Sequence, residues 1–238
     1  VAWNSLFLAV LVGVLTTLLG LVFALVVTRS GFRYMHGLRA LTVLPIITPP
    51  FVIGLAIILL FGLSGAVTTS VADFLGVRPT RWIYGLPGIL IAQVLAFTPI
   101  AFLVLIGVVE GVSPSMEEAA QTLRANKWQT FRTVSLPLMR PGLANAFLIG
   151  FIESLADFGN PLVLGGEYDV LSTGIFFAIV GAQHDQGRAA VLAIVLLVFT
   201  LGAFVAQHFW LGRKSYATVT GKGDAGLSVA LPRRARWL

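Results

Sequence analysis

Long uninterrupted runs of apolar residues dominate the chain and set its predicted structure. Five runs approach or exceed the roughly 20 residues that an α-helix needs to cross about 30 Å of hydrocarbon. We predict five membrane spans, over residues 5–27, 41–61, 86–109, 142–164 and 189–211. Polar residues gather between these runs and do not alternate within them, so the pattern favours helices over the strands of a β-barrel.

The composition supports the same class. Of 238 residues, 57% are hydrophobic and only 11% are charged, and there is no Cys. A soluble globular domain carries about 25% charged residues, and a small secreted module of the disulfide-stapled kind needs Cys. We therefore predict an all-α integral membrane protein with five transmembrane helices.

The positions of the basic residues predict the orientation. If successive loops alternate sides, thirteen of the sixteen Lys and Arg residues follow the first, third and fifth spans. Positive residues concentrate in cytoplasmic loops, so we expect the N-terminus outside and the C-terminus in the cytoplasm. The net charge of +6 then reports topology in the lipid bilayer, and we expect no nucleic-acid partner.

The inner loop between the third and fourth spans, residues 110–141, is amphipathic and too long for a simple connector. A first short helix is expected to begin at Ser113-Pro114, since proline favours the first helical position; Ser115 with Glu118 is an alternative capping box. Its apolar face comprises Met116, Ala119, Ala120 and Leu123. A second short helix carries Trp128, Phe131 and Val134 and is expected to close at Leu136-Pro137. Such faces suit insertion into a groove on another protein.

At these residues the chain resembles the membrane subunits of type I ABC importers. The family motif is E-A-A, three residues, G, nine residues, I or V, one residue, then L-P. Every spacing is matched by Glu118-Ala119-Ala120, Arg124, Val134 and Leu136-Pro137. Arg124 departs from the family glycine. Because arginine adopts a left-handed conformation less easily, we expect the break to move to Asn126 or the loop to couple less well.

The resemblance implies that this cytoplasmic loop is a coupling element that docks on a separate ATPase. The residues it assigns to that coupling are Glu118, Ala119, Ala120, Leu123, Arg124, Leu136 and Pro137. The chain lacks a phosphate-binding G-x-x-x-x-G-K-[ST] loop, so we expect no catalytic residues, and ATP and Mg to be bound by the partner. Further implied partners are an extracytoplasmic substrate-binding protein and a second permease half, as a homodimer, a paralogue or a fused segment.

Residues 1–212 are then the permease domain, in the bacterial inner membrane, and residues 213–238 a basic cytoplasmic tail or linker. The segment from Ala156 to Pro161, with Gly165-Gly166 and the run 169–173, is most similar to the ferric iron branch of the family. Related branches handle phosphonate, thiamine, sulfate or polyamines. The implied function is ATP-driven import, with ferric iron as the first choice of substrate.

Acidic residues inside the fourth predicted span form a second candidate site. Glu153 and Asp157 lie four residues apart and so are expected on one helical face, which Asn160 extends. Charged groups inside a membrane mark transport pathways by default, so we assign these three to the translocation pathway; hydrogen bonding between helices is the alternative. Two acids do not make a metal site, and we assign none.

Two other functions compete with the importer. An ion-coupled secondary transporter using Glu153 and Asp157 is the main alternative, although such a carrier needs no amphipathic inner loop. An intramembrane enzyme is disfavoured because Cys is absent and no Ser and His pair falls at matching depth in two spans.

Overall fold

The computed structural model describes residues 1–29, 37, 42, 45, 48–182 and 184–212, and the described part consists of helices and the segments that connect them, with no strand. Its elements are α1 (Ala2–Arg29), α3 (Pro50–Phe61), α4 (Ala66–Leu75), α5 (Leu86–Glu110), α6 (Pro114–Thr122), α7 (Lys127–Thr130), the π-helical turn η2 (Phe131–Ser135), α8 (Leu136–Ala156), α9 (Gly159–Leu164), α10 (Leu171–Val180) and α11 (Gln186–Gly212). The predicted tail 213–238 lies outside the described residues.

Five helical segments of this part are long and apolar enough to cross a membrane, which confirms the predicted number of spans. They are Ala2–Arg29, Pro50–Leu75, Leu86–Glu110, Lys127–Ala156 and Gln186–Phe209. The bounds of two spans differ from the prediction. The second segment begins at Pro50 and continues through a turn at 62–65 into α4, and most of the predicted residues 41–47 lie outside the described residues. The fourth begins well before Gly142 and ends before Asp157.

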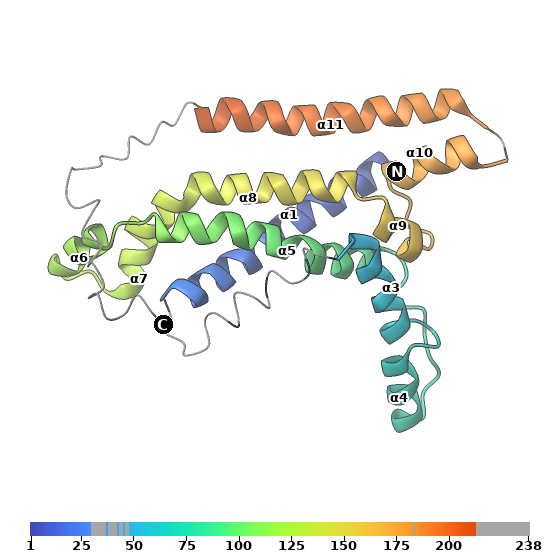
Figure 1. The fold of residues 1–238 in the computed structure, drawn as a ribbon, viewed down its shortest axis with the longest axis horizontal. Helices are drawn as coiled ribbons and strands as arrows, with labels where there is room; N and C mark the ends of the chain where they lie inside the picture. Colours follow the sequence, from blue (N-terminus) through green and yellow to red (C-terminus); the bar gives the residue numbers. More distant parts are fainter. Residues whose placement is uncertain (30–36, 38–41, 43–44, 46–47, 183, 213–238) are drawn as a thin grey trace, which may run out of the picture.

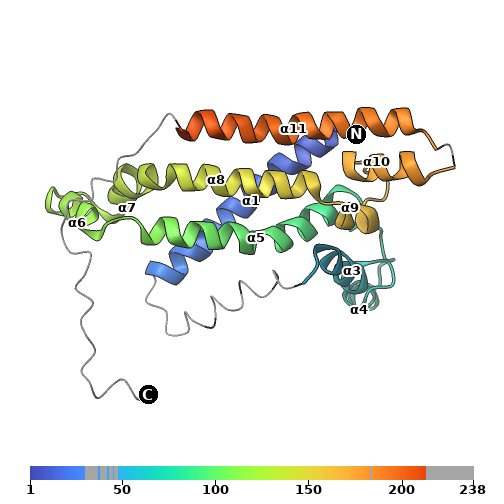
Figure 2. The ribbon, with the colours of Figure 1, turned by 45° about the horizontal axis from the view of Figure 1, so that its top comes forward.

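The helix α5 is the centre of the bundle. It is the most buried of the five segments and packs against both α1 and α8, while α11 lies against α8 and α10 and is the least buried. In both ribbon views α8, α5 and α11 run alongside one another and α1 crosses them, while α3 and α4 project from one end (Figures 1 and 2). The exposed surfaces of α3 and α11 are apolar, as lipid or a further protein segment requires.

Close contact between helices depends on small residues. A Cβ atom at Gly20 of α1 would lie 2.9 Å from the backbone nitrogen of Phe102 in α5, and one at Gly150 of α8 would lie 2.6 Å from Thr16 Oγ1. Association in lipid depends on such close packing because the hydrocarbon is as apolar as the helix surface. The hydroxyl of Thr16 is satisfied within α1 by donating to the carbonyl of Val12 at 2.7 Å.

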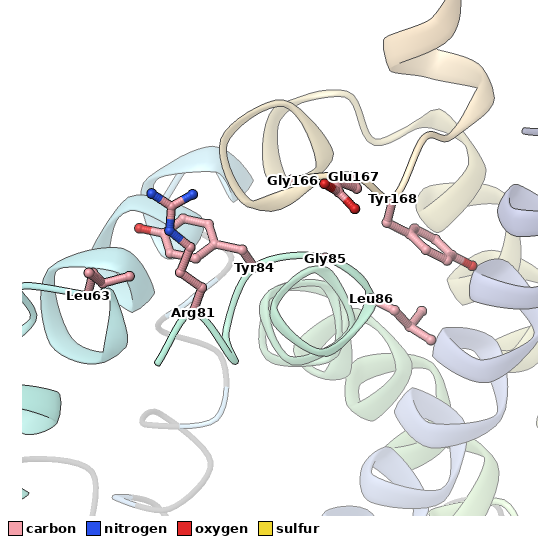
Figure 3. Close-up of a pocket in the computed structure, with 8 residues that line it drawn as sticks. All are labelled: Leu63, Arg81, Tyr84, Gly85, Leu86, Gly166, Glu167 and Tyr168. Atoms are coloured by element: carbon pink, nitrogen blue, oxygen red, sulfur yellow. The ribbon is translucent and has the colours of Figure 1, made fainter. Parts of the chain in front are cut away.

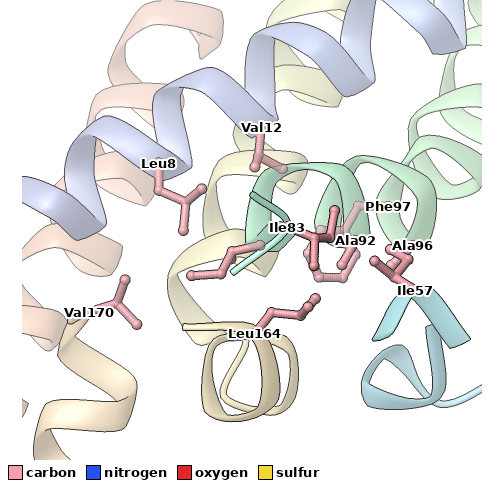
Figure 4. Close-up of a cluster of buried hydrophobic side chains, with 10 residues drawn as sticks. Leu8, Val12, Ile57, Ile83, Ala92, Ala96, Phe97, Leu164 and Val170 are labelled. Atoms are coloured by element: carbon pink, nitrogen blue, oxygen red, sulfur yellow. The ribbon is translucent and has the colours of Figure 1, made fainter. Parts of the chain in front are cut away.

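The end of the bundle that holds the N-terminus has its own core. Leu8 and Val12 of α1 contact a buried cluster that includes Ala92, Phe97 and Leu164 (Figure 4). Hydrogen bonds fix the same end: Tyr168 donates to the carbonyl of Asn4 at 3.0 Å, and the backbone of Leu171 donates to Ser5 Oγ at 2.7 Å. The start of α1 is thereby held against the segment between α9 and α10.

Candidate functional site

The helix α6 lies at the opposite end of the molecule from the N-terminus, beside the last turn of α1 (Figure 1). It contains no buried residue. Met116 is 49% exposed and Leu123 is 83% exposed, although both belong to the predicted apolar face. The predicted first helix of the loop is therefore confirmed, and its apolar face is uncovered in the part of the chain that the structure describes.

The start of α6 follows the prediction only in part. Pro114 takes the first helical position and Ser113 the N-cap position, but the side chain of Ser113 makes no capping bond. It pairs with the hydroxyl of Ser115 at 2.7 Å. The capping box predicted for Ser115 and Glu118 is therefore wrong, because Ser113 and not Ser115 precedes the first turn.

The end of α6 corrects the expectation for Arg124. This residue itself adopts the left-handed conformation, with φ of 66°. Its N–H donates to the carbonyl of Gln121 at 2.9 Å and that of Ala125 donates to Ala120 at 3.1 Å, which is the Schellman pattern that usually takes glycine. The break stays at the family position because these two bonds satisfy carbonyls at the helix end.

Asn126 has a different role from the one expected. It caps the start of α7: its Oδ1 accepts from the backbone of Gln129 at 2.8 Å, and Gln129 Oε1 accepts from the backbone of Asn126 at 2.9 Å. This reciprocal pair is a capping box built with Asn and Gln. The turn between α6 and α7 is thus fixed on both sides.

The prediction that the second helix of the loop closes at Leu136-Pro137 is wrong. α7, η2 and α8 follow one another without interruption, and Leu136 and Pro137 form the first turn of α8. A proline ring in a regular helix clashes with the carbonyl four residues before it. The π turn ends at Ser135, two residues before Pro137, and its wider turn gives the ring more room. The inner loop that begins at Glu110 therefore continues directly into the fourth span.

Glu117, and not Glu118, connects α6 to the rest of the protein. Arg29 Nη1 lies 2.6 Å from both carboxylate oxygens of Glu117, and Ser135 Oγ also donates to this carboxylate. Burial opposes ionisation of Glu117, but the hydrogen bonds from Arg29 and Ser135 and the positive charge of Arg29 outweigh it and lower its pKa. Glu118 is exposed. Arg29, Glu117 and Ser135 were not identified from the sequence.

The predicted acidic site lies where the fourth span breaks. α8 ends at Ala156, Asp157 takes an extended ψ of 120°, and α9 begins at Gly159. Pro161 explains the break, because its ring would clash with the carbonyl of Asp157 in a continuous helix. That carbonyl accepts instead from Ser172 Oγ at 2.8 Å.

The carboxylate of Asp157 is hydrogen-bonded on both oxygens. Oδ2 accepts from Gln93 Nε2 at 2.9 Å and from Asn160 Nδ2 at 2.8 Å, and Oδ1 accepts from the backbone of Gly159 at 3.1 Å and of Asn160 at 3.4 Å. Gln93 Oε1 in turn accepts from Ser154 Oγ at 2.7 Å. Gln93 is fully buried in α5 and was not identified from the sequence, so this network joins α5, α8 and α9.

The three residues predicted for the translocation pathway do not share one environment. Glu153 is exposed on α8, Asp157 is half-buried, and Asn160 is fully buried in α9. Asn160 lies against α3, where a Cβ at Gly54 would come 2.7 Å from its Oδ1. The expectation of a single helical stripe is wrong because the helix ends between Glu153 and Asn160. Their role in transport stays a prediction.

A cavity of about 750 Å³ lies at the end of the molecule opposite α6. Arg81 and Tyr84 of the segment before α5 line it, together with Glu167 and Tyr168 of the segment between α9 and α10 (Figure 3). In the part of the chain that the structure describes, no three His, Cys, Asp or Glu side chains gather closely enough to hold one metal ion.

Five apolar helices and an exposed amphipathic helix at one end define a multi-pass membrane protein. The comparison with protein families identifies the particular family. Residues 16–210 match the family described as binding-protein-dependent transport system inner membrane component, and the chain belongs to that family. It is therefore a permease segment of the ABC importer class, located in the inner membrane.

Individual relatives support the same family assignment. The chain is 50% identical over 229 residues to the ferric transport system permease protein FbpB of Actinobacillus pleuropneumoniae, covering 96% of this chain and 33% of that protein. It is 32% identical to the molybdenum transport system permease protein ModB of Azotobacter vinelandii, over 81% of this chain and 85% of ModB. The chain spans about a third of the length of the ferric transport relatives it matches.

A solved structure shares the fold. The crystal structure of a bacterial ABC transporter that imports the acidic polysaccharide alginate aligns with a TM-score of 0.73 at 18% identity, over 89% of this chain and 78% of that chain. The family match and these relatives give no support to the alternative of an ion-coupled secondary transporter.

Proposed function

We propose that this chain is half of the membrane pathway of an ATP-driven importer for ferric iron. A binding protein delivers the substrate from outside, and a second permease half completes the pathway. Two ATPase subunits bind on the cytoplasmic side. The ferric iron assignment is supported by the 50% identity with FbpB over nearly the whole of this chain.

The exposure of α6 is the observation that supports a coupling role for this helix. α6 projects beyond the bundle with Met116 and Leu123 exposed, and it is fixed by defined turns at its end. Apolar residues exposed on a short helix at the aqueous end of a membrane protein favour insertion into a groove of a partner. Glu118 and Arg124 border this face and are exposed, so they are available for polar contacts with the ATPase.

The orientation and the direction of transport follow from the same placement. α6 and Arg29 are at one end of the molecule, and we assign that end to the cytoplasm because the basic loops belong there. The N-terminus and the cavity lined by Arg81 and Glu167 are then on the outer side. We place substrate arrival at this outer end and the pathway near the break that contains Asp157 and Asn160.

Transport in proteoliposomes tests the proposal. The full-length permease, reconstituted with its ATPase and binding protein, is expected to accumulate radiolabelled ferric iron with external binding protein and internal ATP. Glu118→Lys is expected to weaken ATPase association and to abolish this uptake while the protein still inserts. Uptake that persists without ATP and collapses with the ion gradient contradicts the proposal.

A further inference from the structure

The inner end of α1 is joined to α6 by an ion pair that links residues 88 positions apart. Arg29 is the last residue of α1, and its Nη1 lies 2.6 Å from each oxygen of Glu117 in α6. The two side chains are 35% and 17% exposed. The pair is thus partly withdrawn from water, where an ion pair is screened less than one on an open surface.

A third element meets the same carboxylate. Ser135 is the last residue of η2, is 1% exposed, and donates its hydroxyl to Glu117 Oε1. The π turn brings it there directly before α8 begins. Glu117 therefore joins α6 to both α1 and the base of α8, and these two long helices pack against each other and against α5.

The helix α6 depends on this anchor. It has nine residues, and isolated helices shorter than about 12 residues are marginal in water. None of its residues is buried, so apolar packing against the residues that the structure describes contributes little to its position. A charge-assisted hydrogen bond is roughly twice as strong as a neutral one. Polar contacts at Glu117 thus hold a helix that has little apolar packing of its own.

We propose that Glu117 is the positioning residue that makes α6, the inner end of α1 and the base of α8 move as one body. The inference rests on the proposed function, because it assumes that α6 is the helix that the ATPase moves. Glu118, one position along, points its charge into solvent and is left for the partner. The two neighbouring carboxylates thus have different roles. Glu118 contacts the ATPase, and Glu117 transmits the displacement of α6 to the membrane helices.

Neutral variants of the two carboxylates separate these roles in the reconstituted full-length complex. Glu117→Gln is expected to keep ATPase association within about twofold and to lower the iron transported per ATP hydrolysed about tenfold, the scale of one charge-assisted hydrogen bond. Glu118→Gln is expected to weaken ATPase association instead. Asp73→Asn, an exposed carboxylate on α4, is the control for loss of one charge and is expected to leave both quantities unchanged.

Charge reversal and crosslinking distinguish positioning from a general loss of structure. The Arg29→Glu and Glu117→Arg single variants are expected to be uncoupled, and the double variant to recover transport per ATP. The 238 residues contain no Cys; with any Cys elsewhere in the full-length complex replaced by Ser, an Arg29→Cys, Glu117→Cys pair can be bridged by a short thiol-specific crosslinker. Bridging is expected to restore coupling that the open pair lacks.

The outcomes distinguish failure of the positioning role from failure of the proposed function. Loss of ATPase association in Glu117→Gln, failure of the double variant to recover, or inhibition by the crosslink overturns the positioning role. Failure of the unmodified permease to bind an ATPase at all overturns the proposed function and is recorded before any variant is compared.

Discussion

Replacing Asp157 with Asn tests the hydrogen-bond network at the helix break. Asn retains one oxygen, which can accept either from the backbone of Gly159 and Asn160 or from the side chains of Gln93 and Asn160. In each orientation the new NH₂ group faces two donors, so two hydrogen bonds are lost. Bonds between membrane helices measure about 0.6 kcal/mol on average and about 1.7 at most, which gives a destabilisation of about 1–3 kcal/mol.

The expected loss is measurable as a lower free energy of unfolding of the purified permease in mild detergent. A second substitution, Gln93→Glu, places a carboxylate opposite the new amide of Asp157→Asn and is expected to recover about one of the two lost bonds, because the amide of Asn160 still faces a donor. Asp169→Asn makes the same chemical change at an exposed position and serves as the control. An Asp157→Asn protein as stable as the parent, with iron uptake impaired, refutes the structural role and favours a direct role in the pathway.

Three further predictions concern the backbone, the packing and the pH. Arg124→Gly is expected to stabilise the end of α6 by about 0.5–1 kcal/mol. A left-handed non-glycine residue costs roughly 1–2 kcal/mol, and the greater freedom of glycine in the unfolded chain offsets part of the gain. Slower amide exchange in α6 is the expected result, and unchanged exchange contradicts the prediction. Gly20→Leu is expected to lower the free energy of unfolding by about 1–3 kcal/mol by overpacking against Phe102. Gly107→Leu is the control, because nothing lies within 4 Å of a Cβ at that position. Equal unfolding midpoints for the two variants contradict the packing argument. The pKa of Glu117 lies below its usual value of 4.5, so its contribution to holding α6 is complete above that pH and is lost as the pH falls through the lowered pKa. Amide protection of α6 should therefore fall in acid, and Glu117→Gln should remove this dependence; a dependence that survives the substitution refutes the assignment.

The number of spans and the exposed helix α6 were predictable because both depend on local signals. Hydrophobic length alone defines a span in lipid, and an amphipathic run between spans must find a partner outside the bilayer. The family spacing from Glu118 to Pro137 also located the loop correctly. These features need no knowledge of which helices touch.

The helix boundaries at prolines were predicted poorly because hydrophobicity does not report backbone geometry. Pro161 ends the helix near Asp157, whereas Pro137 is accommodated by the π turn η2 and the helix continues. The clash of a proline ring with the carbonyl four residues before it does not by itself locate the first boundary, because Pro99 and Pro141 lie inside α5 and α8 and those helices continue. The second depends on a local widening of the helix that no sequence pattern marks.

The partners of the charged residues could not be predicted either. Gln93 reads as one polar residue in an apolar span, and only the packing of α5 against α8 brings it to Asp157. Glu117 and Glu118 are neighbours of the same type, and the rotation of α6 decides which one meets Arg29. Such assignments need the tertiary structure because they join residues from 64 to 88 positions apart.

The most direct test of the coupling role is site-specific photo-crosslinking from Leu123 of α6 in the assembled transporter. Its side chain is 83% exposed on the face assigned to the partner. A photoreactive amino acid at this position is expected to crosslink to the ATPase subunit on the cytoplasmic side. A crosslink to another protein only, or modification of this position by a membrane-impermeant reagent from outside the cell, contradicts the assignment.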